Sequence, residues 1–136
     1  MTNWARPAFV DTNVLVRHLT GDSPVMAKAA TAYLESSTTL LLVDLVAAEL
    51  TFVLESVYER PRMEIAETLR ALLAVPAIHV ADLELLHRTV EIYEHDRLDF
   101  AEAYLVASAE RSGIGAVVSL DRSIDRVTTI QRIEPP

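Results

Sequence analysis

The chain has 136 residues, of which 51% are hydrophobic, enough to bury a core without disulfide bonds. It contains no cysteine, which excludes disulfides and thiolate chemistry. The net charge of −8 argues against simple electrostatic binding of nucleic acid, although 11 of the 12 basic residues are Arg, the side chain that grips phosphate with a planar fork.

No stretch approaches the roughly 20 apolar residues that a membrane-spanning helix needs. Residues 1–10 contain an Arg, a Pro and no long apolar run, which is not typical of a signal peptide. We therefore expect a soluble cytoplasmic protein that does not associate with membranes.

Short runs of Val, Ile and Leu alternate along the chain with longer helical patterns. We expect strands at 8–10, 40–43, 78–80, 116–119 and 130–133. We expect helices at 23–36, 45–58, 62–74, 82–95 and 99–112. This alternation, with no repeat or linker, predicts one three-layer α/β/α domain over residues 1–136 with a central parallel sheet.

Local chemistry supports the helix boundaries. Ser23 and Pro24 form a typical N-cap and first-turn pair. Asp82 can cap the helix that follows it, and Gly113 and Gly115 can end the last long helix.

Two acidic residues directly follow predicted strands. Asp11 comes after the run 8–10, and Asp121 comes after the run 116–120. Ligands of open parallel sheets bind at the carboxyl ends of strands, so we expect these side chains at one edge of the sheet. The alternative for each is a simple helix cap.

Helical periodicity places two further acids near buried faces. Glu49 lies on the flank of an apolar stripe, whereas Glu55 is expected on the opposite, solvated side. The stripe consists of Val46, Leu50, Val53, Leu54 and Val57.

Glu102 shares a helix face with Leu105, Val106 and Ala109, where a carboxylate is costly unless it is paired. A buried salt bridge to Arg97, Arg111 or a distant Arg is one explanation. Asp99, one turn earlier, is either the helix N-cap or part of the same site. Several converging acids without matching cations are the ligands that a hard divalent cation needs.

Other chemistries find no support in the sequence. There is no glycine-rich phosphate loop, no G-x-S-x-G motif and no HExxH motif. Asn13 occupies the place where a phosphatase of the haloacid-dehalogenase type would need a second Asp. We interpret the four histidines as structural: His18, His79, His87 and His95.

Four segments together resemble the PIN-domain family, and within it VapC-type toxins of bacterial toxin–antitoxin pairs. These segments are V-D-T-N-V-L at 10–15, A-A-E-L at 47–50, L-D-F-A-E-A-Y-L-V-A at 98–107 and S-L-D-R at 119–122. The resemblance covers nearly the whole chain.

The resemblance implies a ribonuclease that depends on Mg²⁺ or Mn²⁺ and is inhibited by a VapB-type antitoxin. It implies catalytic roles for Asp11, Glu49, Glu102 and Asp121. The metal ligands would be Asp11, Glu102, Asp99 and Asp121, with support from Thr12 and Asn13, which follow the first Asp. The family also implies a homodimer, and an antitoxin bound in an apolar groove, for which we expect the helices at 45–58 and 62–74.

One position departs from the family pattern, which usually has Asp where this chain has Glu102. The extra methylene shifts the carboxylate by about a bond length, and catalytic geometry tolerates little displacement. A catalytically weak or inactive PIN-fold interaction module is therefore the alternative to an RNA-cleaving enzyme. If RNA is the substrate, Arg17, Arg122 and Arg126 are candidates for contacts with its backbone.

Overall fold

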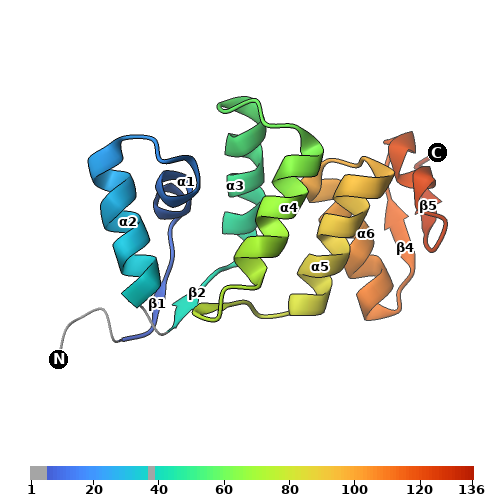
Figure 1. Cartoon of the computed structure of the whole chain (residues 1–136). Helices are drawn as coiled ribbons and strands as arrows, with labels where there is room; N and C mark the ends of the chain where they lie inside the picture. Colours follow the sequence, from blue (N-terminus) through green and yellow to red (C-terminus); the bar gives the residue numbers. More distant parts are fainter. Residues whose placement is uncertain (1–5, 37–38) are drawn as a thin grey trace.

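A computed structural model describes residues 6–36 and 39–136. Its elements follow the predicted alternation of short strands and longer helices (Figure 1). In chain order they are β1 (Ala8–Phe9), α1 (Thr12–Thr20), α2 (Pro24–Ser36), β2 (Leu40–Leu41), α3 (Asp44–Ser56), α4 (Arg62–Leu73), β3 (Ile78–His79), α5 (Leu83–Glu91), η2 (Ile92–Asp96, a π-helical turn), α6 (Phe100–Ser112), β4 (Ala116–Val118), η3 (Arg122–Arg126, a 3₁₀ helix) and β5 (Gln131–Ile133).

All strand pairs are parallel, which confirms the predicted α/β class and fits a three-layer α/β/α arrangement. The strands form two sheets, however, rather than one central sheet. In the first sheet β2 lies between β1 and β3, and the second sheet consists of β4 and β5. Helices α3 to α6 lie between the α1–α2 pair at one end of the molecule and β4–β5 at the other, so β1 and β4 do not pair (Figure 1).

Helix α1 was not expected from the sequence. It buries Leu15 and Val16 and ends at Gly21, whose left-handed backbone (φ 69°) lets its N–H bind the carbonyl of Arg17 at 3.0 Å. Helix α1 packs on α2 and α3. It therefore sets the direction in which the chain leaves β1, immediately after Asp11.

The predicted helix boundaries are otherwise close to the observed ones. Helix α2 begins at Pro24, Asp82 caps α5 by accepting the N–H of Leu85 at 3.1 Å, and Gly113 ends α6 with a φ of 79°. The predicted helix at 82–95 is in fact α5 followed by η2, after which Arg97 adopts a left-handed conformation (φ 59°).

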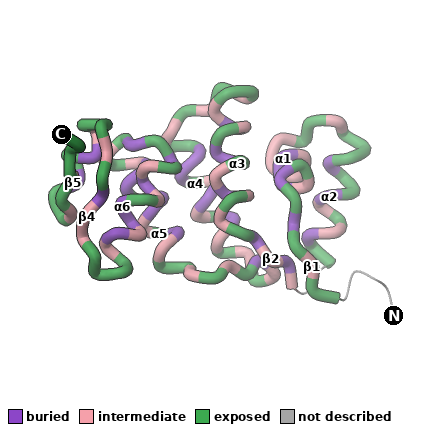
Figure 2. Tube along the Cα trace, turned by 180° about the vertical axis from the view of Figure 1, so that it is seen from behind, coloured by how far each residue is buried: buried purple, intermediate pink, exposed green. Residues whose placement is uncertain are grey.

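One hydrophobic core runs through α3 to α6 and the first sheet, where the buried residues concentrate (Figure 2). The buried face of α3 consists of Ala47, Leu50, Thr51 and Leu54, so the predicted stripe is correct at its centre and wrong at Val57, which is exposed. No helix in the described parts of the chain is long and apolar enough to cross a membrane.

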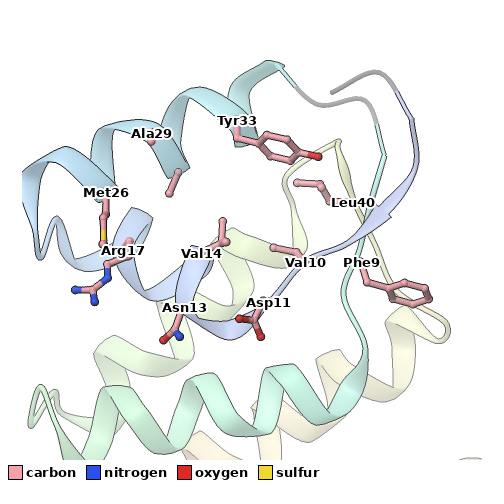
Figure 3. Close-up of a pocket in the computed structure, with 11 residues that line it drawn as sticks. Phe9, Val10, Asp11, Asn13, Val14, Arg17, Met26, Ala29, Tyr33 and Leu40 are labelled. Carbon is pink, nitrogen blue, oxygen red and sulfur yellow. The ribbon is translucent and has the colours of Figure 1, made fainter. Parts of the chain in front are cut away.

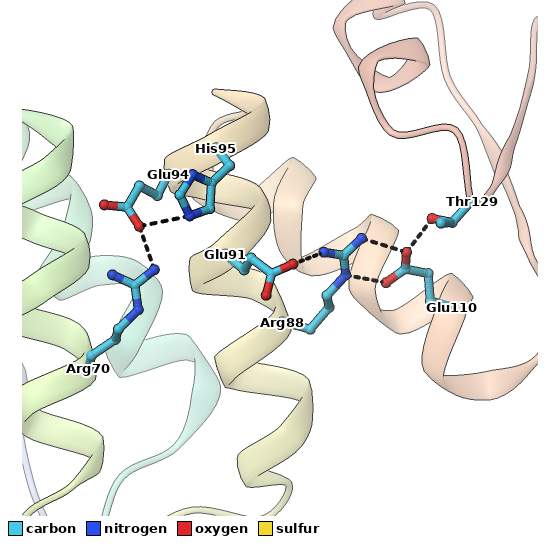
Figure 4. Close-up of polar contacts among 7 residues, drawn as sticks. All are labelled: Arg70, Arg88, Glu91, Glu94, His95, Glu110 and Thr129. Carbon is cyan, nitrogen blue, oxygen red and sulfur yellow. Dashed lines mark hydrogen bonds and ion pairs between the residues drawn. The ribbon is translucent and has the colours of Figure 1, made fainter.

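Ion pairs join the helices at the core's edge (Figure 4). Arg88 on α5 donates twice to Glu110 on α6, at 2.7 and 2.9 Å, and Thr129 donates to the same carboxylate. Arg70 on α4 binds Glu94 in η2, which also contacts His95. These contacts fix α6 and the turn before it relative to α4 and α5.

Candidate active site

The carboxyl groups of Glu102 and Asp121 lie close enough together for each to shift the pKa of the other. Glu102 lies in the first turn of α6, and Asp121 follows β4 as the N-cap of η3. The interaction with the Asp121 carboxyl group, then burial, then repulsion from Asp121 and Asp99 raise the pKa of Glu102 to about 7. The same interaction, with the hydrogen bonds from Ser123, lowers the pKa of Asp121 to about 2. Near neutral pH Glu102 is therefore about half protonated, while Asp121 is ionised.

Ser123 holds both members of this pair. Its hydroxyl donates to Oε2 of Glu102 at 3.3 Å, and its backbone N–H donates to Oδ1 of Asp121 at 2.9 Å. The backbone N–H of Asp121 in turn donates to the hydroxyl of Ser119 at 3.0 Å. Ser123 was not predicted as a site residue, although an Asp side chain commonly accepts the backbone N–H two residues further on, in an Asx turn.

Asp99 occupies the N-cap position of α6 without capping it. Its side chain makes no cap hydrogen bond, while its carbonyl accepts the N–H of Ala103 at 2.8 Å. The negative charge of Asp99 contributes to the raised pKa of Glu102. Asp99 therefore belongs electrostatically to the Glu102–Asp121 pair, and the simple cap interpretation of Asp99 is wrong.

A salt bridge does not explain Glu102. Arg111 binds Asp82 at 2.9 Å and Glu84 at 2.6 Å instead. In residues 6–36 and 39–136, no ion pair reaches Glu102. Its helix face is also less buried than predicted, because Leu105 is exposed while Val106 and Ala109 are buried.

Asp11 lies apart from this pair, at the N-cap of α1, where its side chain makes no cap hydrogen bond. It lines a groove of about 660 Å³ between α1, α2 and the first two strands. In this groove the side chains of Asp11 and Asn13 point to the same side, away from Tyr33 on α2 (Figure 3). The hydroxyl of Thr12 is buried and has no hydrogen-bond partner among the described residues, so its expected supporting role stays a prediction.

Glu49 is exposed on α3, one residue before the buried Leu50. Within the described residues, no three Asp, Glu or His side chains come together in a way that could hold a metal ion on their own. The structure thus brings Glu102 and Asp121 together, with Asp99 close enough to act on them, but it does not add Asp11 or Glu49. The physical reason is the separation of β1 from β4, which leaves their two Asp residues at the ends of different sheets.

The chemistry of the carboxylate pair fits a Mg²⁺ or Mn²⁺ ion. Mg²⁺ usually keeps several water ligands and takes one or two protein carboxylates together with oxygens of a substrate phosphate. Asp121 is ionised at neutral pH, and Glu102 has a proton that a cation can replace. These two side chains are the residues that would hold the ion.

The three Arg residues that are candidates for RNA contacts differ in whether their side chains already bind other groups of the protein. Arg17 lies 3.6 Å from Asp22 in a surface ion pair. Arg126 donates to the carbonyls of Arg97 at 3.0 Å and Asp96 at 3.4 Å, so its role is at least partly structural. Arg122 is exposed beside Asp121, and its side chain makes no hydrogen bond or ion pair within the described part of the chain.

Comparison with known proteins adds one match. The model of a family described as PIN domain matches residues 8–130, which include all the acidic residues discussed above. A search of curated proteins finds no match.

Proposed function

The chain belongs to the PIN-domain family, and we propose that it is a metal-dependent ribonuclease acting as the VapC-type toxin of a toxin–antitoxin pair. The PIN domain is a nuclease fold. RNA as the substrate, the metal requirement and the toxin role are parts of the proposal.

The observation that carries this proposal is the meeting of Glu102 and Asp121, whose carboxyl groups are both bound by Ser123. Two carboxylates from different elements meet with no ion pair to either of them among the described residues, although Arg126 acts on Asp121 at longer range, and each would be more easily accommodated alone. A divalent cation bound there would lower the pKa of a coordinated water and stabilise charge on a phosphodiester. Asp121 contributes an ionised carboxylate, Glu102 gives up its proton when the ion binds, and Ser123 keeps both side chains oriented.

Asp11 and Glu49 enter the proposal through the family motif rather than through contacts with this pair. Asp11 would be a further ligand, and Glu49 would orient or deprotonate the attacking water. Arg122, next to Asp121, is exposed and has no side-chain partner among the described residues, so its guanidinium can bind an RNA phosphate.

RNA cleavage in the presence of Mn²⁺ or Mg²⁺ tests the proposal. We expect EDTA to abolish cleavage, and Asp121→Asn and Asp11→Asn to lower it at least about a hundredfold. A purified protein whose cleavage survives EDTA and Asp121→Asn is not this nuclease. If Asp121→Asn abolishes cleavage and Asp11→Asn does not, only the carboxylate pair is used.

A second function is favoured by the departure at Glu102 together with the position of Asp11 outside the pair. In this alternative the chain is a PIN-fold interaction module with little or no catalysis. Calorimetry would then detect no Mn²⁺ binding, and Glu102→Asp would give no gain in cleavage. A gain of tenfold or more in Glu102→Asp would instead identify an active enzyme that is slowed by its longer side chain.

The toxin role predicts a VapB-type antitoxin and a homodimer. The groove beside Asp11 is the best place for an antitoxin segment, because apolar side chains, most of them from α2 and the first two strands, line most of it. This position differs from the expected one along α3 and α4. Growth arrest on expression of the chain, relieved by co-expression of the neighbouring small gene, would support the role, and normal growth with active RNA cleavage would argue against it.

A further inference from the structure

Arg62, the first residue of α4, joins the two ends of the turn that precedes α6. Its Nη1 donates to the carbonyl of Tyr93 at 2.8 Å and to the carbonyl of Leu98 at 2.6 Å. Tyr93 lies in η2, and Leu98 directly precedes Asp99. One guanidinium therefore spans the whole irregular segment between α5 and α6.

The same guanidinium also stacks on a buried ring. Its Cζ lies 4.4 Å from the centre of the Tyr93 ring, a distance typical of a cation–π contact. The Tyr93 hydroxyl donates to Glu55 on α3 at 2.9 Å, although Glu55 was expected to face solvent. A continuous chain of contacts thus links α3, which carries Glu49, to the start of α6.

The stability of α4 does not explain this use of an Arg. A cation in the first turn of a helix faces the positive end of the helix dipole, which is unfavourable. The contacts of Arg62 with η2 and Leu98 are instead specific for a planar side chain with several donors.

The turn held by Arg62 is also held from the other side. Arg126 in η3 donates to the carbonyls of Asp96 and Arg97. Since η3 begins directly after Asp121, this contact fixes the Asp121 side of the carboxylate pair to the same turn. Arg97 in this segment has a left-handed backbone, a conformation that is unfavourable for an Arg. Contacts such as those of Arg62 and Arg126 are therefore needed to stabilise the segment in this conformation.

We propose that Arg62 is a positioning residue for the acidic site, fixing the start of α6 so that Asp99 and Glu102 face Asp121. Its importance for catalysis rests on the function proposed above, whereas its effect on the start of α6 does not. Arg62 makes no hydrogen bond or ion pair with Asp99, Glu102 or Asp121, and it acts through the carbonyl of Leu98.

The test compares Arg62→Ala and Arg62→Lys with Arg60→Ala as a matched control. Arg60 lies two residues before Arg62, in the connection between α3 and α4, and its side chain makes no hydrogen bond or ion pair within residues 6–36 and 39–136. The first measurement is amide hydrogen exchange by NMR at Ala103, whose N–H binds the carbonyl of Asp99, with the amides of α2 as the reference.

We expect Arg62→Ala to speed exchange at Ala103 about tenfold, to leave the α2 amides unchanged and to weaken Mn²⁺ binding about tenfold, as loss of a supporting partner does at metal sites. In an active enzyme, kcat falls and KM changes less than twofold. For Arg62→Lys we expect values of these quantities between those of Arg62→Ala and the wild-type protein, because Lys keeps a donor but cannot stack on the Tyr93 ring as a planar group. Arg60→Ala should change none of these quantities.

Uniform acceleration in α2 and α6 alike, or no selective change at Ala103, overturns the proposal and leaves Arg62 with a general role in stability. If the unchanged protein neither binds Mn²⁺ nor cleaves RNA, the proposed function fails, while exchange at Ala103 still decides whether Arg62 fixes the start of α6. If Arg62→Ala does not fold, the same comparison is made between Arg62→Lys and Arg60→Ala.

Discussion

The carboxyl groups of Glu102 on α6 and Asp121 at the start of η3 lie close together, which raises the pKa of Glu102 to about 7 and lowers that of Asp121 to about 2. The two residues are brought together by a helix that begins two residues before Glu102 and by a strand that ends three residues before Asp121. Ser123 contacts both side chains and so favours this orientation. The pair behaves as one titrating unit, and several consequences can be measured.

The pair should make the protein less stable as the pH rises towards neutrality when no metal is bound. Folding raises the pKa of Glu102 from 4.5 to about 7, so its contribution to the free energy of unfolding is fully present below about pH 4.5 and is lost as the pH rises through 7. Asp121, with its lowered pKa, contributes in the opposite sense and only at acidic pH, losing its contribution as the pH falls from about 4 towards 2. Urea denaturation at pH 5 and pH 8 in EDTA measures the difference.

Glu102→Gln is the matched variant for this experiment, because its amide can donate to Asp121 but does not titrate. We expect the variant to equal the unchanged protein at pH 5 and to be the more stable of the two at pH 8. An equal loss of stability in both proteins between these pH values would show that other groups cause it.

Ser123→Ala should raise the pH at which Mn²⁺ binds. The hydroxyl of Ser123 lowers the pKa of Glu102, so its removal leaves the proton on Glu102 more firmly held. We expect Mn²⁺ affinity to fall severalfold at pH 7 and to recover by pH 8.5. Ser112→Ala is the control, since the Ser112 hydroxyl binds only local backbone groups at the end of α6. A loss of affinity that is the same at both pH values would contradict this explanation.

Substitution of Arg122 and of Arg126 should have different effects, the first on RNA binding and the second on the stability of the fold. Arg122→Ala should weaken RNA binding and reduce its salt dependence by about one phosphate contact, with thermal stability unchanged. Arg126→Ala should lower the melting temperature, because the carbonyls of Asp96 and Arg97 lose their donor. Fluorescence anisotropy at several salt concentrations measures RNA binding by both variants, and thermal melts measure their stability. A lower melting temperature in Arg122→Ala and weaker RNA binding in Arg126→Ala would contradict these assignments.

The local features of the fold were predictable, and the long-range ones were not. Pro24, Asp82 and Gly113 act within one turn of their own positions, so their effects can be predicted from neighbouring residues. The contact of Tyr93 with Glu55 joins residues 38 positions apart, and no periodicity of α3 indicates that this acid has a partner.

The same distinction applies to the site. Glu102 was identified because its helix face also carries apolar residues, and Asp121 because it follows a strand. Whether Asp11 joins them depends on the pairing of β1 with β4, a tertiary contact between edges that the sequences of these short strands do not specify.

Thr12→Val should stabilise the protein. The Thr12 hydroxyl is buried without a partner among the described residues, and a buried unsatisfied hydroxyl costs about 1–3 kcal/mol, whereas Val has nearly the same shape. Thr51→Val is the control, because Thr51 is equally buried but donates to the carbonyl of Ala47 at 2.9 Å, so its removal should be neutral or destabilising. Thermal melts of both variants measure the effect. If Thr12→Val is instead destabilised and loses RNA cleavage, the hydroxyl takes part in the hydrogen bonding that the resemblance to PIN domains implies.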